Sequence, residues 1–353
     1  MTDEQHIGGD LIPSLPNDIA VRCIARVPRL YHPYLSHVSR SWRSLLHSPL
    51  LSAVRSDLGI TEPFLLVNIR SPTDQSQWFV LHRRRRNPSP LPSPPLAAVG
   101  SAAAAIGAVL FLLGGSVSGV PSSAVQVFDA RRRRWSLGPR MSSAREFAAA
   151  AAIDGRIYAV GGCIPPSEAW AEALDPVAGD RWSPVPSPPE IREKWMHGCA
   201  VLAGKLLAVA DRGGVVYDPA AEPPWGTVPV ELDLGWRGRA AVVGEMLYSY
   251  DFLGKIKGYD PQMDEWKTVE GVEKELPKFL CGATLANLGG VLCVVWEGKG
   301  DGRRRKEMVV DWAGITVSKT QSGGLQGKVL WTDSVVLALP KGSSVAHCLA
   351  LEL

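Results

Sequence analysis

Residues 149–162 have the sequence AAAAIDGRIYAVGG, and this stretch sets the interpretation of most of the chain. Two short runs of apolar residues flank Asp154-Gly155. That dipeptide favours a tight hairpin, because both central positions of a type I′ turn need positive φ. Residues 102–115, AAAAIGAVLFLLGG, show the same pattern without a gap, 47 residues earlier. The recurrence predicts one supersecondary unit that is used repeatedly.

A second mark follows each unit: an apolar or aromatic residue before an aspartate, then a tryptophan six or seven residues later. The pairs are Asp129 with Trp135, Asp175 with Trp182, Asp218 with Trp225, and Asp260 with Trp266. The aspartates recur 46, 43 and 42 residues apart. Later copies of the apolar run, at 206–211, 247–251 and 291–297, lack the glycine pair. A period of 42–47 residues with four short strands per unit predicts a β-propeller.

Each mark has a physical role in such a fold. Glycines let the backbone pack closely near the axis, an aspartate can accept hydrogen bonds from turn amides, and a tryptophan on the outer strand can fill the space between neighbouring blades. Residues 64–351 divided by the period give six or seven blades. We favour six, with the N-terminal strands (64–69 and 78–81) and the C-terminal hairpin (335–339 and 345–351) in one shared blade, because this closure leaves no open sheet edge. Seven blades is the alternative.

The N-terminal region has helical periodicity instead. Residues 1–11 are predicted to be a disordered lead, 12–58 a helical domain and 59–353 the propeller. Pro16 suits a first helical turn, with Ser14 or Asn17 as cap, and Pro28 stops this helix. A second helix is predicted from Leu35 to Leu46, ending near Ser48-Pro49. About 40 residues cannot bury much of a core alone, so an exposed apolar stripe here predicts a partner surface.

Composition narrows the function classes. Apolar residues make up 46% of the 353 residues, enough for a sizeable core, and the net charge of +3 does not by itself argue for nucleic-acid binding. Arginine-rich runs at 83–86, 131–134 and 303–306 fit solvated loop tips, with nuclear import or phosphate contact as the alternative. Residues 96–120 carry no charge, but their internal glycines and their in-phase copy at 149–162 argue against a membrane helix. Six cysteines without paired spacing and a polar N-terminus predict the cytoplasm and/or the nucleus.

The residues 12–51 also resemble an F-box, the short helical motif that docks a substrate receptor onto the adaptor of a cullin–RING ubiquitin ligase. The resemblance rests on Leu15-Pro16-x-Asp18-Ile19 and on later residues in their order and spacing; an ordinary helical hairpin packed on the next domain is the alternative. It implies an adaptor-binding set: Leu15, Pro16, Ile19, Ile24, Pro28, Leu35, Val38, Trp42 and Leu46. For Trp42 the register with Val38 and Leu45 favours the helical core over the adaptor.

The repeat resembles the kelch repeat: an apolar strand, a glycine pair, an aromatic-aspartate and a tryptophan. Together the two resemblances imply a plant-type F-box/kelch-repeat protein, which is the substrate-recognition subunit of an SCF-type ligase. It would hold the adaptor with its helices and a protein for ubiquitination with its propeller. A propeller enzyme (oxidase or hydrolase) and a scaffold without any ligase link are the alternatives.

The sequence offers little for catalysis or for a cofactor. Its seven histidines are scattered, and no HExxH, GxSxG or paired Cys/His spacing occurs. Residues 298–302 are glycine-rich, yet arginines and a predicted strand follow them rather than a helix, so they cannot offer helix-dipole amides to a phosphate. We therefore predict neither enzyme activity nor a metal or other cofactor.

One rim of the predicted propeller carries cations. The links between blades end in Arg145, Lys194, His197, Arg237, Arg239 and Lys278, each just before a predicted innermost strand. If these links converge around one axial mouth, low-dielectric walls strengthen the combined field. The predicted substrate segment is then acidic or phosphorylated and is held by arginine forks. The alternative is that each cation pairs with a sequence neighbour, such as Glu146, Glu193 or Glu275, and recognises nothing.

Overall fold

The computed structural model describes residues 10–83, 88–163, 167–192, 194, 196–210, 213–236, 239–251, 253–280, 282–298 and 307–353. Several predictions fall outside this part of the chain. They concern residues 1–9 of the lead, most of the arginine-rich runs at 83–86 and 303–306, Arg237, and the side chain of His197.

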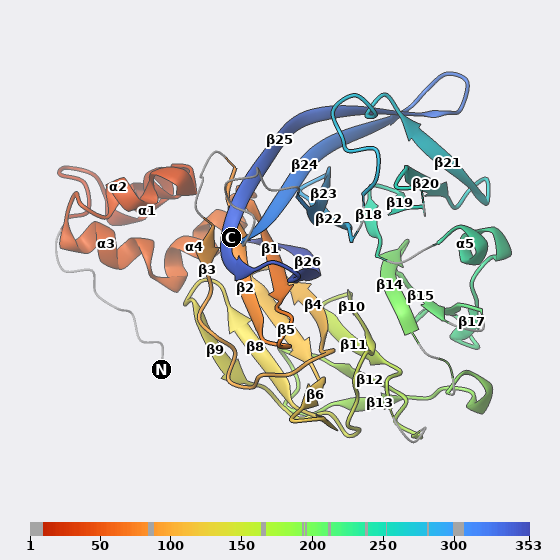
Figure 1. The fold of residues 1–353 in the computed structure, drawn as a ribbon. Coiled ribbons are helices and arrows are strands. Elements are labelled where there is room, and N and C mark those ends of the chain that lie inside the picture. Colours follow the sequence, from red (N-terminus) through yellow and green to blue (C-terminus); the bar gives the residue numbers. More distant parts are fainter. Residues whose placement is uncertain are drawn as a thin grey trace.

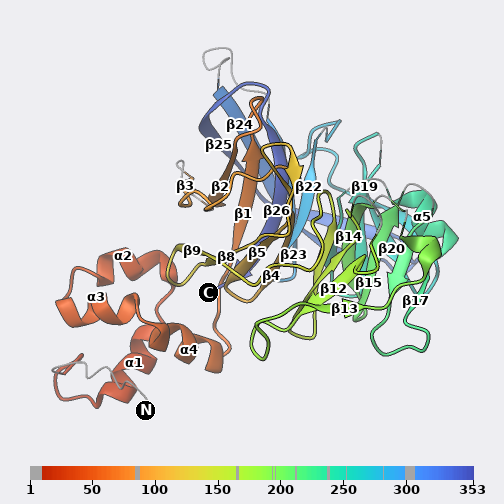
Figure 2. The same ribbon diagram turned by 90° about the horizontal axis from the view of Figure 1, so that it is seen from below.

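The N-terminal region is helical, and its helices gather on one side of the sheets (Figure 1 and Figure 2). The elements are α1 (Asn17–Ala25), η1 (Arg29–Tyr31), α2 (His32–Leu35), α3 (Arg40–Leu46) and α4 (Pro49–Asp57). Their buried apolar cluster consists of Leu11, Ala20, Val21, Ile24, Ala25, Leu45 and Leu51. Leu11 is thus a core residue, which corrects the predicted boundary of the lead. Although the residues before it in the sequence are mostly polar, burial of the leucine side chain away from water is favourable.

The predicted second helix is broken into two. Ser39 has an extended backbone (φ −158°, ψ 167°), and its hydroxyl accepts a hydrogen bond from the Trp42 N–H at 3.1 Å, so it is the N-cap of α3. Pro49 begins α4 instead of ending a helix, because proline at the first position lacks only an N–H that would have no partner. Pro16 is the N-cap of α1 rather than part of its first turn.

The remainder of the chain is all-β and propeller-like. Among the residues that the structure describes, four sheets have four strands each, one sheet has eight, and one small sheet has two. The first four-stranded sheet consists of β26 (Ser344–Glu352), β1 (Pro63–Arg70), β2 (Ser76–Leu81) and β3 (Ser89–Pro90), and the second of β4 (Ala102–Ile106), β5 (Val109–Leu113), β8 (Val125–Asp129) and β9 (Arg134–Leu137). The third consists of β10 (Ala149–Ile153), β11 (Arg156–Val160), β12 (Ala171–Leu174) and β13 (Ser183–Val185). The fourth consists of β14 (Met196–Leu202), β15 (Lys205–Ala210), β16 (Val215–Tyr217) and β17 (Trp225–Thr227).

The eight-stranded sheet is made of two antiparallel halves. One half is β18 (Ala241–Val243), β19 (Met246–Tyr250), β20 (Ile256–Asp260) and β21 (Glu265–Glu270), and the other is β22 (Thr284–Leu288), β23 (Val291–Glu297), β24 (Glu307–Lys319) and β25 (Leu325–Pro340). The halves join through a parallel pairing of only two residue pairs, between β21 and β25. Four short elements complete the described part of the fold: β6 (Ser116–Val117), which pairs with β7 (Val120–Pro121), η2 (Pro189–Ile191) and α5 (Val230–Gly235).

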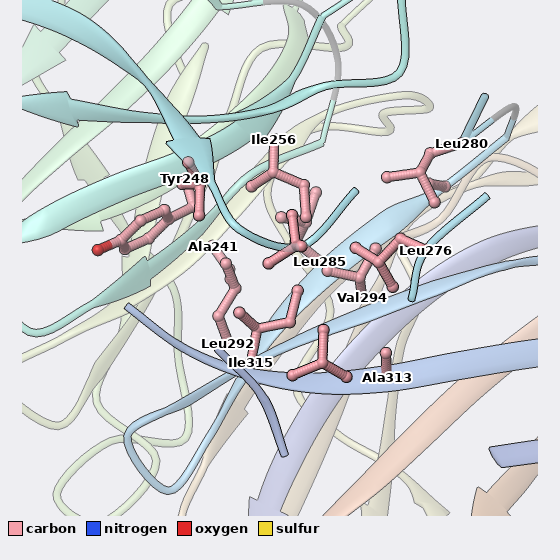
Figure 3. Packing of buried hydrophobic residues seen from close by; sticks show 14 of the residues in the cluster. Ala241, Tyr248, Ile256, Leu276, Leu280, Leu285, Leu292, Val294, Ala313 and Ile315 are labelled. Carbon is pink, nitrogen blue, oxygen red and sulfur yellow. The ribbon is translucent and has the colours of Figure 1, made fainter. Parts of the chain in front are cut away.

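The two halves also pack face to face through a buried cluster (Figure 3). Ala241, Tyr248 and Ile256 come from one half, and residues such as Leu292 and Ile315 come from the other. Side chains therefore fill the space between the halves in the same way as between separate sheets. In Figure 1, β24 and β25 are long curved ribbons that extend beyond this contact to reach β21.

The chain closes on itself as predicted, with a correction. The C-terminal strand β26 pairs antiparallel with β1, so the two ends of the β region share one sheet. The sequence predicts that a whole C-terminal hairpin joins this sheet. Residues 335–339 instead belong to β25 of the neighbouring sheet, because β25 pairs along its length with β24.

In the described part of the chain, six strands line the axis: β4, β10, β14, β18, β22 and β26. Each of them contacts the next one in this order, and β26 contacts β4, so they form a closed ring. Each ring strand is an edge strand of its sheet, and this radial arrangement leaves only short edges that neighbouring strands protect at the axis.

The repeated sequence marks have the predicted structural roles. Asp154 and Gly155 both have positive φ, 48° and 76°, in the turn between β10 and β11. Asp175 accepts hydrogen bonds from the turn amides of Val177 and Ala178 at 3.0 and 2.9 Å. A Cβ on Gly114 would lie 2.2 Å from the Arg145 carbonyl oxygen, so only glycine allows the link between sheets to approach.

The tryptophans connect neighbouring sheets, as predicted, and also donate hydrogen bonds. Trp182 is buried in a cluster that contains Phe111 and Val125 of the preceding sheet. Its indole N–H donates to the Pro139 carbonyl at 2.9 Å, and the equivalent bonds join Trp135 to Pro92 and Trp225 to Pro186.

The uncharged run at 96–120 contributes β4 to β7. Among the residues that the structure describes, no helix is both long enough and apolar enough to cross a membrane.

Candidate functional site

The predicted adaptor-binding residues divide by exposure. Pro16, Ile19, Pro28 and Val38 are exposed, with Ile19 at 42% and Val38 at 61%. Leu15, Leu35, Trp42 and Leu46 are half-buried and pack against the helical core cluster. Exposed large apolar side chains on a domain this small indicate a contact surface.

Ile24 is corrected from a partner-binding residue to a core residue. It lies on the inner side of α1 and is only 1% exposed, in the same cluster as Leu45 and Leu51. Since α1 buries Ala20, Val21 and Ile24 together, the helix turns Ile24 away from any partner.

Trp42 packs against the helical core, as its register with Val38 and Leu45 predicts. Its indole N–H donates to the Leu11 carbonyl oxygen at 2.6 Å, and its ring packs against the helical cluster. This bond also explains why Leu11 is held in the core.

Two exposed aromatics were not among the predicted residues. Tyr31 ends η1 and Tyr34 lies in α2, and Tyr34 is 72% exposed. A signal was present in the sequence, because two tyrosines flank His32-Pro33 where the helical periodicity is interrupted. They enlarge the exposed apolar set of the helical domain, together with Ile19 and Val38.

Glu62 joins the helical domain to the propeller. Its carboxylate accepts hydrogen bonds from Arg55 Nη2 at 2.6 Å and from the Arg29 N–H at 3.0 Å. Its backbone pairs with that of the C-terminal Leu353 in both directions, at 2.8 and 3.1 Å. One residue thus contacts α4, η1 and the end of β26.

A cavity of about 860 Å³ opens at one end of the axis. Its walls include Ala102, Ala149, Met196, Thr284 and Ser344, which begin β4, β10, β14, β22 and β26, and Ala240, which precedes β18. The mouth is therefore formed by the links that enter the ring strands and by turns such as 71–75. We call it the link-side mouth. Its size suits a peptide side chain or a small molecule.

The structure does not bring all the predicted cations together there. Of those with described side chains, Arg239 lines the cavity. Lys194 Nζ donates to the Gly213 carbonyl at 2.8 Å, and Lys278 is exposed, 5.9 Å from the ring of its neighbour Phe279. Arg237 and the His197 side chain lie outside the described part, although His197 itself is in β14.

Arg145 is corrected from a substrate-binding residue to a structural one. It has no accessible surface, and its guanidinium pairs with the equally buried Glu172. It also donates to the carbonyls of Gly161, Ala169 and Trp170 at 2.7–2.9 Å. A buried charge needs such partners to offset its lost hydration, and a guanidinium without accessible surface cannot reach a substrate.

Two residues of the mouth were missed from the sequence. Arg70 ends β1 and lines the cavity, and it is exposed. Phe147 lies in the link before β10 and is 50% exposed. Arg70 lies at the end of a strand, whereas the sequence predicted only cations in the links between blades.

The deeper wall of the cavity is uncharged. Burial and the nearby Arg239 cation lower the pKa of His347 to about 4, so its imidazole is neutral at physiological pH. Burial raises the pKa of the Cys199 thiol to about 11, and its Sγ donates to the Ala150 carbonyl. Burial likewise raises the pKa of Cys348. Across the described ranges, no group of three or more His, Cys, Asp or Glu residues could hold a metal ion.

Comparison with known proteins matches both parts of the chain. The F-box domain model matches residues 12–52, and the FKB95, Kelch-repeats domain model matches residues 70–336. Two F-box/kelch-repeat proteins of Arabidopsis thaliana are each 33% identical to this chain, over 374 and 367 residues. These matches cover 96% of this chain and 93% and 95% of the relatives. A third such protein is 33% identical over 362 residues, with 92% and 86% covered. The chain therefore belongs to the F-box/kelch-repeat family.

Proposed function

We propose that this protein is the substrate-recognition subunit of an SCF-type ubiquitin ligase complex. The observation that carries the proposal is the presence of two separate binding surfaces on one chain. The helical domain exposes Ile19, Tyr31, Tyr34 and Val38, and the propeller-like region offers the cavity at its link-side mouth. The adaptor, and through it a cullin–RING ligase, would bind the first surface. A protein substrate would bind the second.

On this proposal the protein positions two partners and is not itself an enzyme. The thiols that line the cavity are held protonated by burial, so they are poor nucleophiles at neutral pH. His347 is a neutral imidazole beside Trp78, whose ring it stacks on with centroids 6.0 Å apart. The family relationship also favours binding over catalysis. We place the protein in the cytoplasm and/or nucleus, because ligases of this class act on proteins there.

We further infer that the propeller has six blades. Six strands form the closed ring around the axis, and each begins a set of four strands. The eight-stranded sheet then counts as two blades, since its halves meet through two residue pairs and otherwise pack face to face (Figure 3). We keep the domain boundary between residues 58 and 59, after α4 and before β1. A crystal structure that showed a seventh set of strands would overturn the count.

The adaptor surface is tested with purified components. Ile19→Asp with Val38→Asp adds two charges to the exposed apolar set without touching the core. We expect the affinity of the full chain for the adaptor, measured by isothermal titration calorimetry, to fall by more than thirtyfold, because anchor residues typically contribute about 2 kcal/mol or more.

The matched control is Val177→Asp with Leu137→Asp, two exposed apolar residues of the propeller. This control should bind the adaptor as wild type does. Far-ultraviolet circular dichroism should show unchanged helix content in both variants. An unchanged affinity for the adaptor in the Ile19/Val38 variant would remove the assignment of this surface, and the proposed function with it.

A further inference from the structure

The link-side mouth carries cations that the protein does not neutralise. Arg70 and Arg239 line the cavity, and Asp74 is the acidic residue in its described lining. The Arg70 side chain forms no ion pair or hydrogen bond with any residue in the described ranges, and Arg239 Nη1 donates a hydrogen bond to the Val345 carbonyl at 2.5 Å. Burial is the main cause of the lowered pKa of Arg239, and the like charge of Arg70 lowers it further, so the two cations interact unfavourably. An anion placed beside them would relieve that repulsion.

Glu297 lies near Arg239 but does not cancel it. Val345 separates the two: its N–H donates to the Glu297 carboxylate, and its carbonyl accepts from Arg239. Among the described residues the two side chains are not within ion-pair distance. Burial raises the pKa of Glu297. Glu297 is not part of the cavity lining, where two arginines stand against one aspartate, so the described lining keeps a positive charge.

An aromatic ring is fixed at the same mouth. Phe147 has φ of 52°, an unusual conformation for a bulky residue, and its N–H donates to the Gly100 carbonyl at 2.7 Å. A Cβ on Gly100 would lie 2.8 Å from this ring, so the glycine makes room for it. Strained backbone of this kind concentrates at ligand-binding positions. It holds half of the Phe147 surface open at the cavity edge.

We propose that the link-side mouth binds a segment of the substrate with glutamate or aspartate side chains, whose carboxylates lie between Arg70 and Arg239 while a neighbouring apolar side chain packs on Phe147. Guanidinium groups bind carboxylates by paired, charge-assisted hydrogen bonds. The neutral deeper wall, with His347 uncharged, suits the aliphatic part of such a side chain. This inference rests on the proposed receptor function and names the class of its substrate.

The test uses the purified full chain and a phage-displayed library of random 12-residue peptides. Peptides selected by the wild type should be enriched in Glu and Asp. The best of them, made synthetically, should bind about tenfold or more weakly to Arg70→Ala with Arg239→Ala. The salt dependence of binding should also flatten in this variant. The matched control, Arg132→Ala with Arg181→Ala, removes two exposed arginines from turns at the other end of the propeller and should bind as wild type does.

Three results would overturn the inference: no selected peptides, selected peptides without acidic enrichment, or unchanged affinity in the Arg70/Arg239 variant. A phosphoserine peptide that binds more than tenfold tighter than its glutamate counterpart would assign the mouth to phosphate instead. Titration of the same variant with the adaptor separates this inference from the receptor function. Normal adaptor affinity with lost peptide binding in this variant supports both. Wild-type protein that binds acidic peptides but has no adaptor affinity supports this inference and removes the receptor function.

Discussion

Arg145 Nη2 lies 2.5 Å from Glu172 Oε1, and neither side chain has accessible surface. Glu172 also accepts hydrogen bonds from the N–H groups of Ser142 and Ser143, at 2.7 and 3.2 Å. The pair thus ties the link before β10 to the strand β12 of the sheet that follows it. It orders the backbone of one side of the link-side mouth without contributing a free charge.

Removal of one member of this pair should strongly destabilise the propeller. Arg145→Ala leaves the Glu172 carboxylate buried without its cation, which should cost about 3–5 kcal/mol in the free energy of unfolding. The double change Arg145→Met with Glu172→Leu should cost less, because no charge is left buried. Urea denaturation measures both. The control is Arg156→Ala, which removes an exposed contact of 4.0 Å to Asp175 and should change stability by less than about 0.5 kcal/mol. A small effect of Arg145→Ala would contradict the structural role.

The hydrogen bond from Trp182 to Pro139 should make a separate contribution. Trp182→Phe keeps an aromatic ring between the sheets and removes the indole N–H, leaving the Pro139 carbonyl without its donor, so it should cost about 1–3 kcal/mol. Trp182→Ala also empties the space and should cost about 3–5 kcal/mol. Thermal unfolding of both variants gives the comparison. Wild-type stability of Trp182→Phe would show that packing alone matters at this position.

His347 should make stability depend on pH in the acidic range. Its pKa is lowered to about 4 in the folded state, below the ordinary value of 6.5. The unfolded chain therefore binds a proton that the folded chain does not, so stability is full above pH 6.5 and decreases as the pH falls towards 4. Because the side chain is only half-buried, we expect the decrease to be no more than about 1–2 kcal/mol. His347→Gln should lose this part of the decrease between pH 7 and pH 4.5, measured by urea denaturation. An identical pH dependence in wild type and variant would refute the assignment.

Glu62 should hold the helical domain against the propeller. Glu62→Ala leaves Arg55, which is 1% exposed, without its carboxylate, and frees the Arg29 N–H. We expect faster amide hydrogen exchange in α4 and η1, and unchanged exchange in the ring strands, because the loss is local. Glu245→Ala, at an exposed turn between β18 and β19, serves as the control. Uniformly faster exchange across the propeller would mean that Glu62 supports the whole fold instead.

Local sequence was sufficient to predict the elements whose physics is local. Asp154-Gly155 gives its turn because both residues take positive φ, and Asp175 accepts from the amides just after it. The spacing of aspartates and tryptophans was enough for the propeller-like architecture. The aromatic-to-link contacts of Trp182 followed from the same repeat, although the Pro139 acceptor did not.

The features that could not be predicted depend on contacts between residues far apart in the sequence. Glu146 lies beside Arg145 in the chain, yet the partner is Glu172, which reaches it from β12. Residues 335–339 have the length and composition of a separate short strand, but the pairing of β25 with β24 absorbs them. Ile24 carries the same apolar signal as Ile19, and only the packing of α1 against α4 decides which of the two is buried.

On the proposed function, one chain joins a ligase adaptor to a substrate through two separate surfaces. Tagged wild type and two variants would be purified from cells with the proteasome inhibited, and the bound proteins quantified by mass spectrometry. We predict that wild type brings down adaptor, cullin and captured proteins. Ile19→Asp with Val38→Asp should lose adaptor and cullin but keep the captured proteins, whereas Arg70→Ala with Arg239→Ala should do the reverse. The proposed function would be contradicted if either soluble, folded variant lost both sets of bound proteins together, or if a variant lost neither set.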